Sequence, residues 1–336
     1  MERQLPENWS DEMIQLAQDF QTEARTMASR NASGEVIAKV AGLLPELTGG
    51  SADLSGSNCT IWPEARGMTA GEADANYIYY GVREFGMTAI CNGMALHGGL
   101  RPFSGTFLIF MEYARNAVRM AALMGVPNIL VYSHDSIGQG EDGPTHQPVE
   151  QLANLRGTPN MQVWRPGDGV ETVFAWQSAI ENNVGPTALV FSRQGLTTLE
   201  RNEAQLTSIA RGAYVLFESD DEPENILIAT GSEVALALEA AKVLIKDGIS
   251  VRVVSMPSVE VFESQDESYR ESVLPSATRR RVAVEAGHVD YWRKWVGLDG
   301  DVIGMTSFGA SAPGGDLFDH FGFTIDAVVQ AVKNLD

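Results

Sequence analysis

The stretch NILVYS at residues 128–133 is a short apolar run, and the polar stretch HDSIGQGEDGPTHQ at residues 134–147 follows it directly. A run of this length and composition predicts a strand that is buried on both faces. In open parallel sheets, ligands bind just beyond the carboxyl ends of the strands. The two stretches together therefore predict an α/β fold with a ligand-binding loop at residues 134–147.

Similar patterns extend in both directions from this stretch. Further buried strands are predicted at residues 161–165 and 187–192, and helices near residues 84–97, 111–124, 148–155 and 169–182. Strand and helix thus alternate, which predicts a mostly parallel sheet with helices on both faces. Nearer the N-terminus, apolar spacing predicts one amphipathic helix over 11–30 and a second over 34–44, which Pro45 and the Gly49-Gly50 pair then end.

A second α/β unit follows the polar stretch 194–211, which lacks a strand pattern and is predicted to hold the domain boundary. Its strand–helix–strand unit runs from a strand at 225–230 through a helix that Ser232 begins to a parallel strand at 250–255. Strands at 281–285 and 301–304 and a closing helix at 325–335 complete it. The predicted division is a helical lead-in at 1–24, a first domain at 25–196, a linker at 197–211 and a second domain at 212–336.

Length and charge limit the possible functions. The chain has 336 residues, enough for two domains, and a formal net charge of -20, which disfavours nucleic acids and anionic membranes as partners. No apolar run approaches the roughly 18 residues of a spanning helix, and the first residues lack a signal peptide, so we expect a cytoplasmic protein. An anionic substrate would need a local cationic group. Cys59 and Cys91 show no metal or redox spacing and are expected to be buried thiols.

The loop at 134–147 contains His134, Asp142 and His146. Imidazoles and carboxylates at this spacing can ligate a metal ion, exchange protons or hydrogen-bond a polyhydroxylated substrate. The alternative is a long solvated loop, in which the glycines, aspartates and proline have no role beyond the turn.

Two further features each allow a structural and a functional interpretation. Glu84 falls at the start of a predicted helix, where it either complements the helix dipole or, if buried, passes a proton to a ligand. The aromatic residues Phe107, Phe110 and Tyr113 either pack in the core or stack on a planar cofactor ring.

A Gly-Asp-Gly triplet at residues 167–169 matches the beginning of a metal–diphosphate motif of thiamine enzymes. The asparagines that would complete the motif, at 182 and 183, come too soon after it. We therefore interpret Asp168 as the cap of a helix and predict no metal ligands in this chain.

These segments together resemble the transketolase family, specifically the C-terminal half of the bacterial enzymes. The matching segments are residues 28–30, 49–54, 80–87, 106–120, 132–138, 140–148 and 192–194. GEDGPTHQPVE, which begins at Gly140, is highly specific in this combination. Deoxyxylulose phosphate synthases and the β subunits of 2-oxo acid dehydrogenases share parts of the pattern, but they do not usually share the context of SADL at 51–54 and SRQ at 192–194.

The resemblance implies a pyrimidine-binding domain followed by a transketolase C-terminal domain, and thiamine diphosphate as the cofactor. It implies that Glu84 contacts the pyrimidine ring and promotes loss of the thiazolium proton. It further implies a pyrimidine pocket lined by the aromatic residues 107, 110 and 113, with Asp53 beside the cofactor.

For the substrate, the resemblance implies that His134, Asp142 and His146 meet the hydroxyls of a sugar phosphate. Arg30, Ser57, His146 and Arg193 would bind its phosphate. An arginine pair is the local cationic group that an acidic protein with an anionic substrate needs.

The implied reaction moves a two-carbon ketol unit from a ketose phosphate such as xylulose 5-phosphate to an aldose phosphate such as ribose 5-phosphate. The family's Mg²⁺ ligands and diphosphate-binding domain lie in an N-terminal half that this chain does not match, and its cofactor sites lie at a homodimer-type interface. We therefore expect little activity without that half. The alternative is a non-catalytic dimerisation or assembly module derived from transketolase.

Overall fold

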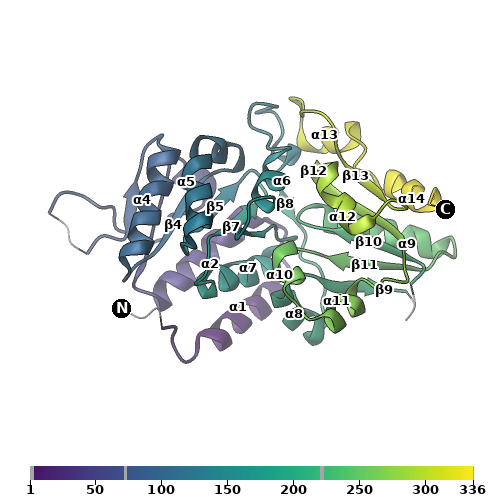
Figure 1. Ribbon diagram of the computed structural model, residues 1–336, viewed down its shortest axis with the longest axis horizontal. Helices are drawn as coiled ribbons and strands as arrows, with labels where there is room; N and C mark the ends of the chain where they lie inside the picture. Colours follow the sequence, from purple (N-terminus) through teal and green to yellow (C-terminus); the bar gives the residue numbers. More distant parts are fainter. Residues whose placement is uncertain (1–3, 72–73, 220–222, 336) are drawn as a thin grey trace.

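The computed structural model describes residues 4–71, 74–219 and 223–335, and Figure 1 shows two sheets that follow one another along its longest axis. The first sheet has six parallel strands in the order β3-β2-β4-β5-β7-β6. Its strands are β2 (Leu47–Ser51), β3 (Tyr77–Tyr79), β4 (Arg101–Phe107), β5 (Ile129–Ser133), β6 (Gln162–Trp164) and β7 (Thr187–Phe191). The central strands β4, β5 and β7 are therefore neighbours.

Helices cover both faces of this sheet. They are α1 (Trp9–Glu23), α2 (Ser29–Leu43), α3 (Ser55–Asn58), α4 (Glu84–His97), α5 (Met111–Met124), α6 (Gln151–Arg156) and α7 (Gly169–Glu181), with the 3₁₀ turns η1 (Leu108–Phe110) and η2 (Ile137–Gln139). Ile129 and Val131 of β5 belong to the cluster that α1, α2 and α7 complete, whereas Leu130 and Tyr132 pack with residues of α5 and α6. Because alternate side chains enter two apolar layers, the strand is apolar throughout.

The second sheet has the order β13-β12-β10-β11-β9. Its strands are β9 (Tyr214–Glu218), β10 (Asn225–Ala229), β11 (Val251–Ser255), β12 (Arg280–His288) and β13 (Asp301–Met305). Its helices are α8 (Glu203–Ser208), α9 (Glu233–Lys246), α10 (Val259–Glu263), α11 (Glu267–Val273), α12 (Arg293–Val296), α13 (Gly314–His320) and α14 (Ile325–Lys333), with the 3₁₀ turns η3 (Ile209–Arg211) and η4 (Val289–Trp292). Among the described strands of this sheet, the edge strand β9 alone runs antiparallel to its neighbour.

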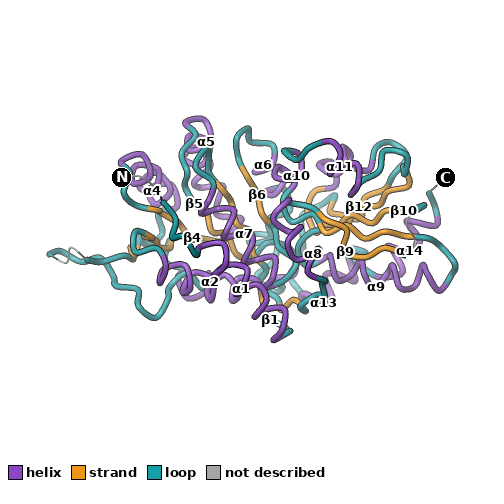
Figure 2. The backbone as a smooth tube through the Cα atoms, turned by 90° about the horizontal axis from the view of Figure 1, so that it is seen from below, coloured by secondary structure: helices purple, strands orange, loops and turns teal. Residues whose placement is uncertain are grey.

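The predicted fold class, two successive α/β domains with mostly parallel sheets, is confirmed. Seen from below in Figure 2, the strands of both sheets lie between helical layers. Within the described parts of the chain, no helix is both long enough and apolar enough to cross a lipid bilayer.

The prediction of one helix over residues 11–30 is wrong. α1 ends at Glu23, Ala24 takes a left-handed conformation with φ 48°, and α2 begins at Ser29. Between the two helices, β1 (Met27–Ala28) pairs antiparallel with β8 (Gly195–Leu196), which lies in a stretch predicted to lack strands. Strands of two residues are too short to produce an alternating pattern, so the sequence could not reveal this pairing.

The Gly49-Gly50 pair is not a break, because it lies inside the strand β2. A Cβ atom at Gly49 would come within 1.8 Å of the Phe103 ring on the neighbouring strand β4, so that ring occupies the space of a side chain. Glycine at this position lets the Phe103 ring approach the backbone of β2 closely. Because glycine usually interrupts helices and strands, the sequence alone did not indicate this role.

The two cysteines differ in how deeply they are buried. Cys91 is buried as expected, but Cys59 is only half-buried, with its Sγ 3.6 Å from Oδ1 of Asn31. The expectation of two buried thiols is therefore wrong for Cys59, which follows the short helix α3 at the molecular surface.

Candidate active site

Three neighbouring strands end at one edge of the first sheet. Phe107, the last residue of β4, pairs in register with Ser133, the last residue of β5, and Ser133 pairs with Phe191, the last residue of β7. The segments 108–110, 134–147 and 192–194 follow these ends. The sheet thus brings most of the predicted site residues to the edge where parallel sheets bind ligands.

The predicted aromatic residues form a stack that leads outward from the strand end. The rings of Phe107 and Phe110 are stacked with centroids 5.6 Å apart, and those of Phe110 and Tyr113 with centroids 5.9 Å apart. Tyr113 is 68% exposed. Packing in the core therefore does not explain the whole stack, because its outer ring, Tyr113, faces open space.

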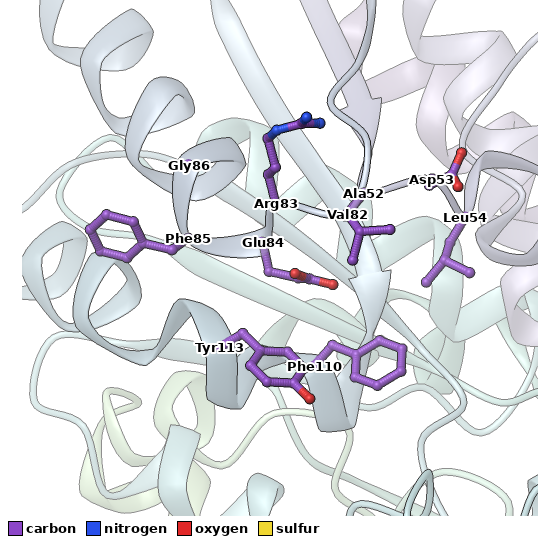
Figure 3. Close-up of a pocket in the computed structure, with 10 residues that line it drawn as sticks. All are labelled: Ala52, Asp53, Leu54, Val82, Arg83, Glu84, Phe85, Gly86, Phe110 and Tyr113. Carbon is purple, nitrogen blue, oxygen red and sulfur yellow. The ribbon is translucent and has the colours of Figure 1, made fainter.

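Glu84 faces this stack across a cavity of about 790 Å³. Figure 3 shows its carboxylate pointing toward the space above Phe110 and Tyr113, from the first residue of α4. The side chain is 7% exposed, and within the described residues it accepts no hydrogen bond. A buried carboxylate without a protein partner is costly, so the site suits a ligand that supplies one.

The cavity fits one end of a planar heterocycle. Its lining residues are Ala52, Asp53, Leu54, Val82, Arg83, Glu84, Phe85, Gly86, Phe110 and Tyr113. A ring could stack on Phe110 and Tyr113 while a ring nitrogen meets Glu84. Asp53 lines the cavity in a left-handed conformation with φ 62° and is exposed.

The predicted cationic group lies nearby. Nη1 of Arg30 donates to the backbone carbonyl of Ser57 at 2.7 Å. Burial lowers the pKa of Arg30, and the positive charge of Arg193 lowers it further, so the two guanidinium groups are close enough to repel one another. The exposed side chain of Ser57 takes no part in the contact with Arg30. Among the described residues, no carboxylate acts on Arg30, and two neighbouring cations of this kind are suited to a phosphate.

His134 and His146 lie beside the aromatic stack. The imidazole of His134 stacks on Phe107 with centroids 3.6 Å apart, and that of His146 meets Phe110 edge-on at 5.4 Å. Burial, together with the charges of Arg30 and Arg193, lowers the pKa of His134 to about 3. His134 is therefore neutral near pH 7, and its imidazole can take part in hydrogen bonds without carrying a charge.

Asp142 is exposed, in the turn between Gly140 and Gly143, and within the described residues no direct contact joins it to the histidines or arginines. The structure thus places it on the same loop as His146 without bringing the two side chains together.

The second domain supports this loop, which the sequence did not reveal. Nε2 of Gln147 donates to the carbonyl of Gly140 within the loop and to that of Ala310 in the second domain, and the Ser311 hydroxyl donates to the carbonyl of Glu141. The conformation of the loop thus depends on a segment about 165 residues further along the chain.

Asp168 caps α7 as predicted, because its side chain accepts the backbone N–H of Glu171 at 3.0 Å. It also pairs with the buried Arg201 at 2.7 Å. In the described parts of the chain, no group of three or more His, Cys, Asp or Glu side chains is arranged to hold a metal ion.

Two family models match this chain. The model described as the transketolase pyrimidine-binding domain matches residues 25–198, and the model described as the transketolase-like C-terminal domain matches residues 212–324.

Curated relatives agree with these models. Transketolase 2 of Aliivibrio fischeri is 57% identical over 331 residues, and Transketolase 1 of Vibrio parahaemolyticus is 57% identical over 332 residues. These alignments cover 98% and 99% of this chain but only 50% of each relative. The chain therefore spans about half the length of the curated relatives it matches.

Solved structures agree as well. A mutant Pichia stipitis transketolase in complex with xylulose 5-phosphate superposes with a TM-score of 0.91 at 40% identity, covering 99% of this chain and 49% of that one. A split-gene transketolase described as an inactive β4 tetramer superposes with a TM-score of 0.72 at 25% identity. In that case the match covers 92% of this chain and 98% of the other, so the two chains correspond over nearly their whole lengths.

Proposed function

The chain belongs to the transketolase family, and from this we propose that it supplies the pyrimidine-binding and sugar-phosphate-binding side of a two-carbon ketol transfer. One observation carries the proposal: the buried carboxylate of Glu84 has no hydrogen-bond partner within the described residues and faces an aromatic-lined cavity. Transketolases use thiamine diphosphate, whose pyrimidine ring has the size and ring nitrogens that such a cavity accepts. The substrates we propose are phosphorylated ketoses and aldoses.

Each predicted residue has a role in this proposal. When bound, the cofactor supplies the nucleophilic carbon that carries the two-carbon unit. Glu84 holds a proton at a pyrimidine nitrogen, which its carboxylate can reach as a hydrogen-bond partner inside the cavity. The rings of Phe107, Phe110 and Tyr113 orient the pyrimidine, and Asp53 lies at the far end of the cavity.

The substrate meets the other group of residues. His134, His146 and Asp142 bind hydroxyl groups, and Arg30 and Arg193 bind the phosphate together with His146 and Ser57. The 3.6 Å stack between His134 and Phe107 supports the proposal, because it connects the hydroxyl-binding group to the pyrimidine-binding group. A substrate bound there would reach both.

We further propose that the other half of the family's length completes the site. The two family models that match this chain describe a pyrimidine-binding domain and a C-terminal domain, and the chain covers 50% of its curated relatives. The diphosphate-binding residues and the Mg²⁺ ligands would come from that other half. Tyr113, Phe85 and Val82, which are 68%, 52% and 73% exposed at the cavity, would lie at the homodimer-type interface that brings the halves together.

One observation favours a second candidate, a non-catalytic assembly module. The solved chain that corresponds to this one over nearly its whole length is described as an inactive β4 tetramer. A half of this kind can therefore assemble without activity.

A reconstitution assay separates the two candidates. The purified chain is mixed with the N-terminal half of the Aliivibrio fischeri relative, thiamine diphosphate and Mg²⁺, and ketol transfer from xylulose 5-phosphate to ribose 5-phosphate is measured. We expect activity in the mixture and little in either half alone. A stable complex of the two halves without transfer would favour the assembly module.

A further inference from the structure

His134 lies where the chain leaves the carboxyl end of β5. Its φ of 63° lies in the left-handed region, which residues other than glycine seldom adopt. The residue is 3% exposed, and its ring is stacked on Phe107. A backbone conformation of this kind costs free energy and persists only where the surrounding structure holds it.

The residue before His134 is anchored within the first domain. The Ser133 hydroxyl donates to the amide oxygen of Asn58 at 2.7 Å, and both residues are fully buried. Ser133 also pairs in register with the last residues of the two neighbouring strands, β4 and β7. Because the strand end is fixed in this way, the position of the imidazole depends on what holds the chain on the other side of His134.

The residue after His134 is anchored by Arg165. Oδ2 of the buried Asp135 accepts a hydrogen bond from Nε of Arg165 at 3.0 Å and lies 2.8 Å from its Nη2. Two guanidinium nitrogens on one carboxylate fix its direction as well as its distance. Arg165 therefore holds Asp135, and through it the backbone that follows His134.

Arg165 is in turn bonded to the second domain. Its Nη1 donates to the carbonyl of Thr230 at 2.9 Å and to Oε2 of Glu233 at 2.5 Å. Its backbone carbonyl accepts the N–H of Gly231 at 3.1 Å, and its backbone N–H donates to the carbonyl of Pro257 at 2.8 Å. Both the main chain and the side chain of this fully buried residue thus follow the second domain.

We propose that Arg165 is a positioning residue through which the second domain holds the imidazole of His134 in the candidate active site. This inference deepens the proposed function, on which it rests for the part that His134 plays in binding a sugar hydroxyl. The chain of contacts itself belongs to the protein without ligand. It can therefore be tested on the purified chain, with no partner half and no substrate.

Arg201 provides a matched control. It also joins the two domains, since its Nη1 donates to Asp168 at 2.7 Å and its Nε to the hydroxyl of Tyr214 at 2.7 Å. Its side chain is as buried as that of Arg165. Among the described residues, none of its hydrogen-bond partners lies in the loop at 134–147. Both arginines are therefore part of a buried ionic contact, and Arg165 is the one bonded to the residue beside His134.

The test is a ¹H–¹³C spectrum of the imidazole groups in the chain labelled with ¹³C-histidine. The chain has five histidines, and the His134 signals are those missing in His134→Asn. Because the ring centroids of His134 and Phe107 are 3.6 Å apart, a small displacement of the imidazole changes its chemical shifts.

We expect Arg165→Lys to move the His134 signals. Lysine keeps the charge but has no planar fork, so it cannot hold Asp135 and Glu233 together. Arg201→Lys should also lose stability, measured by urea unfolding, but should leave the His134 signals in place.

Two further variants disturb the same contact from either side. Asp135→Asn keeps the size of the side chain and removes its charge, so it tests the contact even if Arg165→Lys fails to fold. Gly231→Ala would place a Cβ atom 2.6 Å from Cζ of Arg165 and displace the guanidinium from the second domain. Both should move the His134 signals. Unchanged signals in the folded variants, or an equal movement in Arg201→Lys, would overturn the proposal.

The reconstituted complex supplies a kinetic readout. Arg165→Lys should raise KM for xylulose 5-phosphate roughly five-fold, as expected for the loss of about one hydrogen bond. The concentration of thiamine diphosphate that gives half the maximal rate should stay the same, because the lining of the cavity at Glu84, within the described chain, includes no residue of the loop at 134–147. An equal rise in both would contradict the positioning role.

The two proposals can fail separately. Moved His134 signals in Arg165→Lys, together with an inactive complex of the unaltered chain, would contradict the proposed function and support the positioning role of Arg165.

Discussion

Ser29 and Ser192 hold each other in a reciprocal pair of hydrogen bonds. The hydroxyl oxygen of Ser29 accepts the backbone N–H of Ser192 at 2.7 Å, and the hydroxyl oxygen of Ser192 accepts the backbone N–H of Ser29 at 3.1 Å. The two residues are fully buried and directly precede Arg30 and Arg193. This serine pair therefore fixes the distance between the two arginines, which repel one another and would otherwise separate.

Ser192→Ala should weaken phosphate binding through the arginines. It removes one hydroxyl and leaves a buried backbone N–H without an acceptor, which costs about 1–3 kcal/mol of stability. In the reconstituted enzyme we expect KM for xylulose 5-phosphate to rise roughly five-fold, as expected for about 1 kcal/mol. KM for an unphosphorylated ketose such as erythrulose should stay the same. An equal rise for both ketoses would mean that the pair does not act through the phosphate.

Loss of Arg165 should strongly weaken the contact between the domains. It is fully buried and pairs with Asp135 of the first domain at 2.8 Å and with Glu233 of the second at 2.5 Å. Arg165→Met leaves both carboxylates buried without their cation, so unfolding by urea should require about 3–5 kcal/mol less free energy. Lys242→Met, which breaks the exposed pair with Glu239, should change stability by less than about 1 kcal/mol. Similar results for the two variants would contradict the assigned role of Arg165.

Glu260 should make stability depend on pH. Burial raises the pKa of Glu260 to about 7, against the opposing influence of Arg156 and with a smaller raising contribution from Glu263. Because the folded state binds this proton more tightly than the unfolded state, stability is greatest below the ordinary glutamate pKa and falls as pH rises toward 7.

Glu260→Gln removes that titration and keeps an acceptor for the backbone N–H of Val163, which the carboxylate accepts at 3.1 Å. The variant should therefore gain stability relative to the unaltered chain between about pH 5 and 8, measured by urea unfolding at several pH values. A constant difference across this range would refute the assignment.

Gly309→Ala should detach the second domain from the loop at 134–147. A Cβ atom at Gly309 would lie 1.6 Å from Oε1 of Gln147, whose Nε2 bonds the carbonyl of Ala310 at 2.9 Å. Hydrogen exchange of the loop amides should become faster in this variant. Gly315→Ala is the control, because no atom lies within 4 Å of the added Cβ. Equal protection of the loop in both variants would show that this contact does not hold it.

The elements that the sequence predicted best are those with local causes. The helices at 84–97 and 111–124 were predicted at their observed bounds, because an apolar stripe runs along each and a glycine, Gly98 or Gly125, follows its last residue. The short strands β1 and β8 escaped prediction because they exist only through their pairing with each other.

The residues of the candidate site also divide into features that the local sequence indicates and features that depend on distant contacts. Glu84 could be placed at a helix start from its neighbours alone, but the absence of a hydrogen-bond partner for it among the described residues depends on the cavity around it. The serine pair joins residues 163 positions apart, and the contact between Asn58 and Ser133 spans 75 positions. For the contact between Ser29 and Ser192, the sequence offered one indication, a serine directly before each arginine. For the contact between Asn58 and Ser133, the neighbouring residues offered none.

Glu84 is the residue on which the proposed function depends, and one comparison tests it most directly. The rate of ketol transfer is measured in complexes reconstituted with Glu84→Gln and with Glu267→Gln, an exposed glutamate that also begins a helix, α11. If Glu84 exchanges a proton with the cofactor, its variant should lose about 10²-fold or more in kcat while the control stays near the unaltered rate. If Glu84 only complements a helix dipole, both variants should remain active and lose only a few tenths of a kcal/mol to about 1 kcal/mol of stability, a result that would contradict the proposed role.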